Sequence, residues 1–459
     1  MTRMDETLSD ARGADRILTR RFLTLATMEF LERFAVSGVK SLLVLLFVDR
    51  LLVGDLSRIV GATVVRQASS AMFGPVSTTG LASQLYGYAN ALLYLAVPIG
   101  GLVGDVIASR RAMVAIGGIG MLLGLTMMLR EPTFLIGLVP LVIGAGLLKG
   151  NLSAQVGLLF QDEAQRRRGY TVYLGFLNAG AICGPLICGA LAAYAAPTYA
   201  IVAAAAAVAI GLALYGVAGR GWIEATTPVR PPQGPSSGGA PATALLAVAL
   251  ASVFLCYSAY DQLGNIFLLW ARERADRQIY GWTMPVAWFL ALDGIFTLAL
   301  IAASGRIARL CTRWGIRVGS LTQIFLGGVL CAVGYLVLAL GDAISGGAAL
   351  GLPWTLPYLL FINGAIVLIW PSALSLITEA APRRLVGLWM GLFYLHGFVS
   401  SLWAGFSGVY YDRVASPHFW LLHAALAGVG AVLILVAGPP LTWRLRQAIT
   451  TSACAKARA

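Results

Sequence analysis

Charged residues are scarce in this sequence. Asp, Glu, Lys and Arg make up 12% of its 459 residues, whereas hydrophobic residues make up 58%. Soluble domains carry about 25% charged residues, and a single soluble core stops growing beyond roughly 250–300 residues. A large soluble helical protein is therefore disfavoured. The composition predicts a protein that is embedded in a lipid bilayer.

Several familiar motifs are also absent. No G-x-x-x-x-G-K-[ST] run is present, which disfavours ATP-driven transport. None of the six cysteines forms a CxxC pair, so we expect unpaired thiols, and no metal-ligand cluster appears. The first 21 residues lack the apolar core of a signal peptide. A net charge of +13 is typical of proteins that bind nucleic acid, but the distribution of the charges along this chain argues against such a partner.

Apolar runs long enough to cross a bilayer recur along the chain. A spanning helix needs about 20 apolar residues. The runs predict an all-α polytopic membrane protein with twelve spans, at 22–48, 84–104, 112–129, 133–153, 170–194, 197–217, 243–270, 285–303, 318–340, 353–376, 386–410 and 417–438.

A segment rich in Pro, Gly and Ser at 219–243 divides the spans into six and six. Such a mixture is typical of a flexible linker. We predict a cytoplasmic N-terminal segment at 1–21, six-helix bundles at 22–218 and 244–438, and a tail at 439–459. Two six-helix halves are typical of the major facilitator fold, in which substrate binds near the bilayer midplane.

The basic residues predict an orientation. Loops on the amino-terminal side hold 22 of the Lys and Arg residues, opposite loops hold eight, and three lie inside spans. The positive-inside rule then places both termini and the linker in the cytoplasm. The protein is expected in the cell inner membrane. The role of the long outer loop at 49–83 cannot be deduced from its sequence.

Charges inside spans are costly unless they are paired or hydrated, so they point to function. The first span holds Glu29, Glu32, Arg33 and Lys40, which helical spacing places on one face. Two adjacent carboxyls do not both ionise readily, so one is expected to hold a proton. A basic neighbour can displace that proton. This pattern favours proton coupling over a static ion network.

Other polar residues in spans are candidates for the same work. Lys149 lies in a glycine-rich run, and close helix packing would let its ammonium reach the acids of the first span; snorkelling is the alternative. Tyr94, Asn178 and Gln262 could line a cavity, or each could bond a neighbouring helix. Two further sets stay open: the tryptophans Trp282, Trp288 and Trp403 as site residues or interfacial anchors, and His396 as a titrating group or a packed hydrogen-bonder.

The sequence resembles the proton-dependent oligopeptide transporter family along nearly its whole length. The family's E-x-x-E-R-F stands at residues 29–34, and its G-x-G-x-x-K-P-N at 144–151, with Gly150 for proline. Its F-Y-x-x-I-N-x-G corresponds to 173–180, its F-E-Q to 260–262 and its W-F-Q-S-L-N-P to 288–294. The resemblance implies a proton-coupled symporter of small peptides or peptide-like solutes, driven by a proton gradient and without a cofactor.

Several family residues are replaced. Two tyrosines that follow the first motif are Val36 and Ser37 here, and the glutamate that holds the peptide amino group falls at Ile366. A new carboxylate, Asp293, stands where the family has a neutral amide. We predict that it takes over the cationic end of the substrate, with Asn178 and Tyr94 facing the other end; the alternative is a bond to a neighbouring helix.

The resemblance also suggests a gate. Lys40 and Asp261 keep the charge signs of the family's gating positions, so we predict that they pair across the two halves. Glu29, Glu32, Arg33 and Lys149 are the predicted proton-coupling group. The predicted substrate residues are Tyr94, Asn178, Gln262, Trp288 and Asp293.

The residues leave three functions open. The first is the peptide symporter, acting as a monomer whose partners are its substrate, protons and the bilayer. The second is a carrier for a non-peptide or drug-like substrate, acting as an importer or as an exporter. The third is a membrane enzyme or a transport-fold sensor, which the missing catalytic cluster and the intact coupling residues disfavour.

Overall fold

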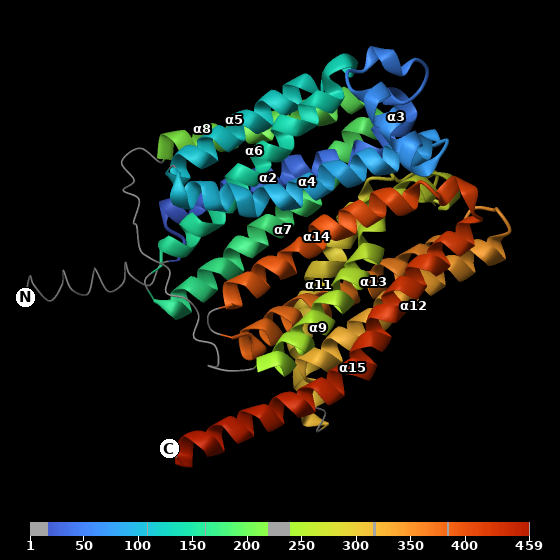
Figure 1. Cartoon of the computed structure of the whole chain (residues 1–459). Coiled ribbons are helices and arrows are strands. Elements are labelled where there is room, and N and C mark those ends of the chain that lie inside the picture. The colour runs from blue at the N-terminus through green and yellow to red at the C-terminus, as the bar shows by residue number, and fades with distance from the viewer. Residues whose placement is uncertain are drawn as a thin grey trace, which may run out of the picture. The chain divides into compact units, whose positions relative to one another are not determined.

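The computed structural model describes residues 17–107, 109–160, 162–218, 239–314, 318–382 and 385–458. The described chain is almost entirely helical (Figure 1). The predicted linker at 219–243 and the N-terminal segment at 1–21 lie largely outside these residues, as does the side chain of Cys454. The other five cysteines are free thiols, as predicted.

Before the linker, the helices are α2 (Arg20–Leu46), α3 (Ala62–Phe73), α4 (Thr78–Val106), α5 (Arg110–Met127), α6 (Phe134–Leu158), α7 (Glu163–Tyr194) and α8 (Pro197–Ala218). After it come α9 (Gly239–Tyr260), α10 (Ile266–Arg274), α11 (Trp288–Arg313), α12 (Ser320–Ser345), α13 (Leu352–Ala380), α14 (Val386–Gly408) and α15 (Ser416–Arg458). Strands β1 (Gln278–Ile279) and β2 (Trp282–Thr283) form a small antiparallel hairpin.

Eleven helical segments of the described chain are long and apolar enough to cross a membrane. The segment missing from that set is α2, whose 27 residues would extend about 40 Å but carry the charges at 29, 32, 33 and 40. With α2 the described chain has twelve helices of spanning length, which confirms the predicted fold class. Helices suit a bilayer because they satisfy their backbone groups internally.

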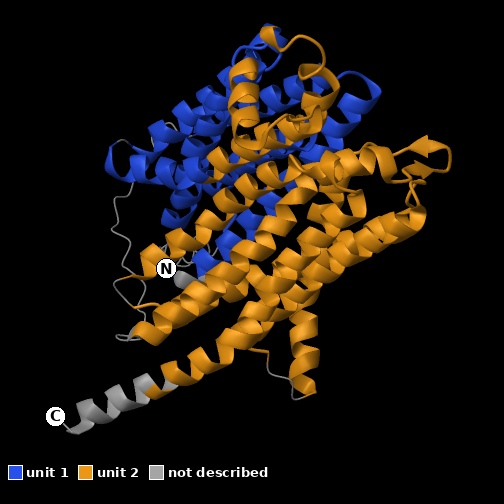
Figure 2. Ribbon diagram, turned by 45° about the vertical axis from the view of Figure 1, so that its right-hand side comes forward, with its two compact units in different colours: residues 1–42, 58–61, 95–228 blue, residues 43–57, 62–94, 229–459 orange. Residues whose placement is uncertain are grey.

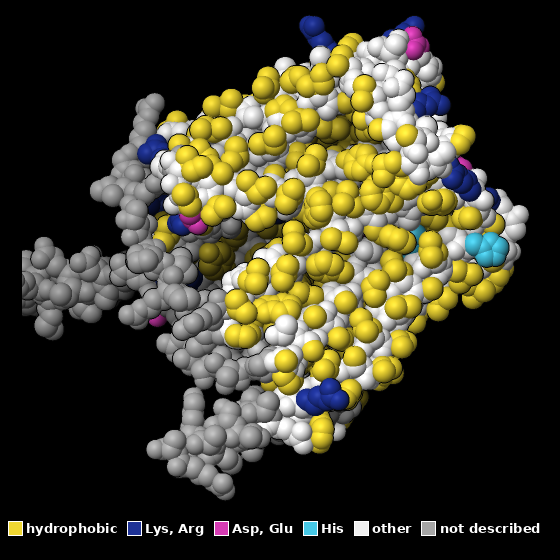
Figure 3. Space-filling view, in the orientation of Figure 1, with side chains coloured by type: hydrophobic (Ala, Val, Ile, Leu, Met, Phe, Trp, Pro, Cys, Tyr) yellow, Lys and Arg dark blue, Asp and Glu magenta, His cyan; other side chains and the backbone are white. Residues whose placement is uncertain are grey.

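The surface matches this assignment. In Figure 3, hydrophobic side chains cover most of the visible face, and Lys and Arg lie mainly towards its edges. Exposed large apolar side chains occur on most of the long helices, for example Ile119 on α5, Val202 on α8 and Val432 on α15. The chain is therefore a polytopic membrane protein.

Two predicted elements differ from the structure. The span expected at 243–270 is not continuous: α9 ends at Tyr260, a 3₁₀ turn η4 (Asp261–Gly264) follows, and α10 starts at Ile266. At the break, the buried side-chain amide of Asn265 donates to Ser83 Oγ (2.7 Å) and to the Ala404 carbonyl (3.1 Å), which connects the turn to α4 and α14. The outer loop is also largely helical, since α3 lies within it and α4 begins at Thr78 rather than at residue 84.

The chain forms two compact units, coloured separately in Figure 2. The first comprises residues 1–42, 58–61 and 95–228, and the second comprises 43–57, 62–94 and 229–459. In the first, glycines let α5 and α6 touch: a Cβ added at Gly124 would lie 2.5 Å from the Gly137 carbonyl oxygen. In the second, α12 packs along α13 and α15. The 62–94 stretch belongs to the second unit although it precedes the linker.

Candidate functional site

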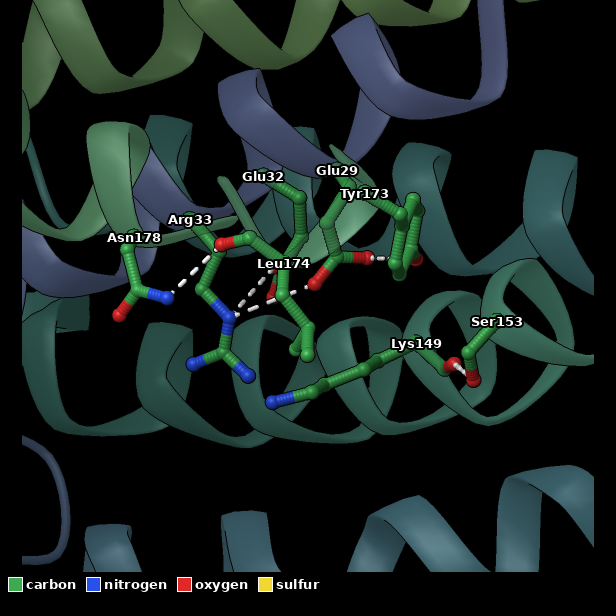
Figure 4. Close-up of polar contacts among 8 residues, drawn as sticks. All are labelled: Glu29, Glu32, Arg33, Lys149, Ser153, Tyr173, Leu174 and Asn178. Atoms are coloured by element: carbon green, nitrogen blue, oxygen red, sulfur yellow. Dashed lines mark hydrogen bonds and ion pairs between the residues drawn. The ribbon is translucent and has the colours of Figure 1, made fainter. Parts of the chain in front are cut away.

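The two acidic residues of α2 lie inside the first unit. Glu29 is 0% exposed and Glu32 is 1% exposed. Between them lies the Arg33 side chain, whose Nε is 3.5 Å from Glu29 Oε1 and 3.6 Å from Glu32 Oε2 (Figure 4). Helical spacing of three and four residues produces this arrangement. One guanidinium thus faces two buried carboxyls.

Tyr173 of α7 completes the group. Its hydroxyl donates a 2.5 Å hydrogen bond to Glu29 Oε2, and its side chain is 3% exposed. Sequence reasoning quoted this residue in a motif but gave it no role. The sequence did hold a clue to this role: the family motif has phenylalanine at this position, so the tyrosine differs from it only by an added hydroxyl. Glu29 therefore has a second partner besides Arg33, whereas Glu32 Oε2 receives no hydrogen bond from the described residues.

Glycines bring α7 close enough for this contact. A Cβ added at Gly180 would lie 2.8 Å from the Cβ of Arg33, and one at Gly184 would lie 2.8 Å from the backbone nitrogen of Gly38. Contacts this short require small residues, the usual device of membrane helix packing. The seam between α2 and α7 thus sets the position of Tyr173 relative to Glu29.

Lys149 and Asn178 lie near this group without joining it by direct bonds (Figure 4). The Lys149 ammonium forms no ion pair or hydrogen bond with a described residue, although its backbone carbonyl accepts from Ser153. The Asn178 amide donates to the Leu174 carbonyl of its own helix at 2.8 Å. Their predicted roles in coupling and in substrate binding therefore stay predictions.

A second buried acid lies in the second unit. Asp261, the first residue of η4, is 7% exposed. Its Oδ2 accepts hydrogen bonds from Ser400 Oγ at 2.6 Å and Ser401 Oγ at 2.9 Å, both on α14. Sequence reasoning missed both serines, which lie about 140 residues away along the chain. Lys40 belongs to the first unit, so its pairing with Asp261 stays a prediction.

The predicted substrate residues of the second unit have varied surroundings. The Tyr260 hydroxyl donates to both oxygens of Asp293, at 3.0 and 3.2 Å. Gln262 is buried, and its amide donates to Ser407 Oγ at 2.7 Å. These bonds match the alternative in which such residues bond a neighbouring helix.

Two of the predicted substrate residues, Trp288 and Tyr94, lie beside other aromatic rings. The Trp288 ring lies 5.2 Å from that of Trp282 beside the β-hairpin, and the Tyr94 ring lies 6.3 Å from that of His396. Asp293 and Tyr94 are partly exposed, so both could contact a solute.

Twelve spanning helices with buried, paired charges define a class of protein, the polytopic secondary transporters. The family model described as Major Facilitator Superfamily matches residues 41–405. The chain belongs to the Major Facilitator Superfamily.

Within this superfamily, the chain is similar to proteins named as peptide transporters. The chain is 25% identical to the peptide transporter YePEPT of Yersinia enterocolitica over 488 aligned residues, covering 89% of this chain and 90% of the relative. It superposes with a TM-score of 0.78 on a mutant form of the peptide transporter POT in complex with sulfate, at 18% identity over 93% and 95% of the two chains. A POT family transporter in complex with 5-aminolevulinic acid gives a TM-score of 0.76 at 18% identity, over 92% and 97%. The predicted resemblance to peptide transporters is confirmed.

Proposed function

We propose that this protein is a proton-coupled symporter of small peptides or peptide-like solutes in the cell inner membrane. The observation that carries the proposal is the buried group of Glu29, Glu32, Arg33 and Tyr173. A transporter driven by protons needs an acid inside the membrane that binds and releases a proton as the protein changes state. The relatives named as peptide transporters support the substrate class.

The geometry supports a division of work between the two acids. Glu29 accepts from Tyr173 and faces Arg33, so its charged form has two partners. Glu32 shares Arg33 but has no further donor among the described residues. A buried carboxyl with fewer donors takes up a proton more readily. We therefore assign the transported proton to Glu32 and the anchoring of Arg33 to Glu29.

The substrate end of the mechanism follows from the replaced residues. Ile366 is buried in α13 and cannot hold a peptide ammonium. Asp293 offers a carboxylate in its place, oriented by the Tyr260 hydroxyl. In this proposal Asp293 takes the cationic end of the solute, Trp288 and Tyr94 supply ring surfaces, and Asn178 faces the other end.

The proposal also includes the orientation of the chain, a gate and a role for Lys149. Both termini lie in the cytoplasm, because the amino-terminal-side loops carry most of the basic residues. Lys40 and Asp261 form a gate that closes when they pair, since an unpaired buried charge is unfavourable. Lys149 belongs to the coupling group and approaches the acids of α2 in another state of the cycle.

The test is uptake of radiolabelled dialanine by the purified protein in proteoliposomes. An inward proton gradient should raise the initial rate at least severalfold over the rate with equal pH on both sides. Addition of a protonophore provides the control, since it removes the gradient while leaving the protein and membrane intact. Uptake that ignores the gradient would contradict the coupling.

A second function, a carrier for a larger, non-peptide solute, is favoured by one set of residues. Val36 and Ser37 stand where peptide transporters have tyrosines, which leaves more room beside α2, and Ile366 removes an acid. Transport of a cationic drug-like amide, together with failure to transport dialanine, would favour this alternative. Counting substrate release from preloaded vesicles would show whether the carrier exports.

A further inference from the structure

The outer loop contains the helix α3 (Ala62–Phe73), whose role could not be deduced from the sequence (Figure 1). Its faces differ in what they contact. One face is buried: Ala62 and Ser69 are 1% and 3% exposed, and positions seven apart share a side of a helix. Ser69 Oγ donates to Gln84 Oε1, which attaches this face to α4.

The C-terminal end of α3 is held as well. The guanidinium of Arg413, in the turn η5 (Tyr411–Arg413), donates to the Phe73 and Pro75 carbonyls at 3.0 and 2.7 Å. Such bonds occupy carbonyls that the end of a helix leaves without partners. The Phe73 ring also lies 5.6 Å from that of Phe406 on α14. Because α3 is attached in two places, the directions of its other faces are defined.

A second face of α3 is an exposed apolar stripe. Val64, Ala68 and Met72 follow one another at intervals of four residues, which places them on one side of the helix. Val64 and Met72 are 65% and 67% exposed. Exposed apolar stripes on amphipathic helices are typical of helices that lie in the interface of a bilayer. In a membrane protein, this stripe is suited to contact acyl chains near the bilayer surface.

A third face of α3 lines a pocket of about 450 Å³. The wall formed by the helix consists of Thr63, Arg66, Gln67 and Ser70, and residues 54–56 of the preceding turn form the other wall. Among the described residues, none forms a hydrogen bond or an ion pair with the Arg66 guanidinium. The pocket therefore offers a cation with its donors available to a ligand.

The turn supplies a negative charge to the same pocket. Asp55 Oδ1 accepts from the backbone nitrogen of Ser57 at 2.9 Å, and its Oδ2 accepts from Ser57 Oγ at 2.6 Å. Gly54, with φ of 81°, has a left-handed conformation that favours glycine. The turn thus fixes the Asp55 carboxylate in the wall of the pocket. One positive and one negative side chain line a single pocket beside an apolar stripe.

We propose that this pocket binds the headgroup of phosphatidylethanolamine, whose acyl chains lie along the stripe of α3. The Arg66 guanidinium pairs with the phosphate, and the Asp55 carboxylate accepts hydrogen bonds from the ammonium. A soluble zwitterion would match the two charges but would leave Val64 and Met72 exposed to water. A phospholipid satisfies both the charges and the stripe. The inference does not depend on what the protein transports.

The test is lipid binding to the purified full-length protein, measured by native mass spectrometry. The wild type should bind phosphatidylethanolamine more tightly than phosphatidylglycerol, which carries the phosphate but no ammonium. Arg66→Gln should weaken binding of both lipids about threefold to fivefold, as expected for an exposed charge pair. Asp55→Asn should instead abolish the preference between them. Equal affinity of the wild type for the two lipids would overturn the proposal.

Two exposed charged residues outside the pocket provide matched controls. Arg58→Gln makes the same charge change in the same loop, and Asp412→Asn makes the acidic change on η5. Both variants should bind the two lipids as the wild type does. If either control lowers the affinity as much as the pocket variants do, the effect belongs to the surface charge as a whole and the pocket is refuted.

The stripe is tested separately. Val64→Ser with Met72→Ser removes apolar area that the acyl chains would cover, so affinity for phosphatidylethanolamine should fall at least about fivefold. The replaced side chains are exposed, so the variants are expected to fold as the wild type does. Glycerophosphoethanolamine, which lacks acyl chains, and dialanine should not displace the lipid at equal concentration. Displacement by either would show that a soluble zwitterion occupies the pocket and would exclude the lipid.

Discussion

The hydroxyl of Tyr173 offers a one-atom test of the coupling site. Tyr173→Phe removes the donor 2.5 Å from Glu29 Oε2 and restores the residue of the family motif. Both side chains are buried, so water does not readily replace the lost bond. Glu29 would keep Arg33, 3.5 Å away, as its remaining partner.

The size of the expected pH shift follows from the fact that the acceptor of this hydrogen bond is a charged carboxylate. A hydrogen bond to a charged group contributes about 1.5–3 kcal/mol, and 1.36 kcal/mol corresponds to one pH unit of proton affinity. Without this donor, the Arg33 guanidinium is drawn towards Glu29 and away from Glu32, so the charged form of Glu32 is less stabilised and Glu32 keeps its proton to higher pH. The pH at which gradient-driven uptake is half-maximal should therefore rise by about 1–2 units.

The assay is initial-rate uptake by proteoliposomes across external pH at a constant gradient. Tyr170→Phe is the matched control, because this neighbouring tyrosine on α7 donates to the Ser153 carbonyl rather than to an acid, at 3.1 Å. Its profile should not move. A Tyr173→Phe profile that overlays the wild type would refute the assignment of Glu29 to the coupling group.

Three further predictions follow from the charged side chains. Glu32→Gln should abolish gradient-driven uptake yet retain part of the substrate exchange, and full uptake in this variant would contradict the assigned proton. Asp293→Asn should lower the preference for cationic over neutral substrates at least tenfold in competition assays; an unchanged preference would exclude its role as ammonium ligand. Exchanging the charges of Lys40 and Asp261 should restore part of the uptake that either single reversal abolishes, whereas no recovery would argue against the gate.

Much of the fold could be predicted from the sequence. Each spanning helix must satisfy its own backbone in lipid, so span length and hydropathy are local properties that a sequence displays directly. Glu29, Glu32 and Arg33 were found for the same reason, because their spacing along one helix determines that they share a face. In the structure, Arg33 Nε lies 3.5 Å from a carboxylate oxygen of Glu29 and 3.6 Å from one of Glu32.

Contacts between side chains that lie far apart in the sequence could not be predicted from helical spacing. Tyr173 lies 144 residues from Glu29, and Ser401 lies 140 residues from Asp261. The turn η4 that interrupts the span after Tyr260 was likewise missed, because Asn265 needs acceptors from α4 and α14 to stabilise it. Nothing near these residues in the sequence indicates the partner.

By itself, then, the sequence determined the twelve spans, the membrane setting, the superfamily and the charged stripe of α2. Only the tertiary structure decided which acid receives which hydroxyl, and that residues 62–94 pack with the unit that contains the later helices. The physical reason lies in the solvent. Lipid tails are as apolar as the side chains they meet, so helix faces are chosen by close packing and by a few hydrogen bonds rather than by hydrophobicity. Because these contacts do not require a periodic pattern of apolar residues, the sequence does not show which helix faces pack together.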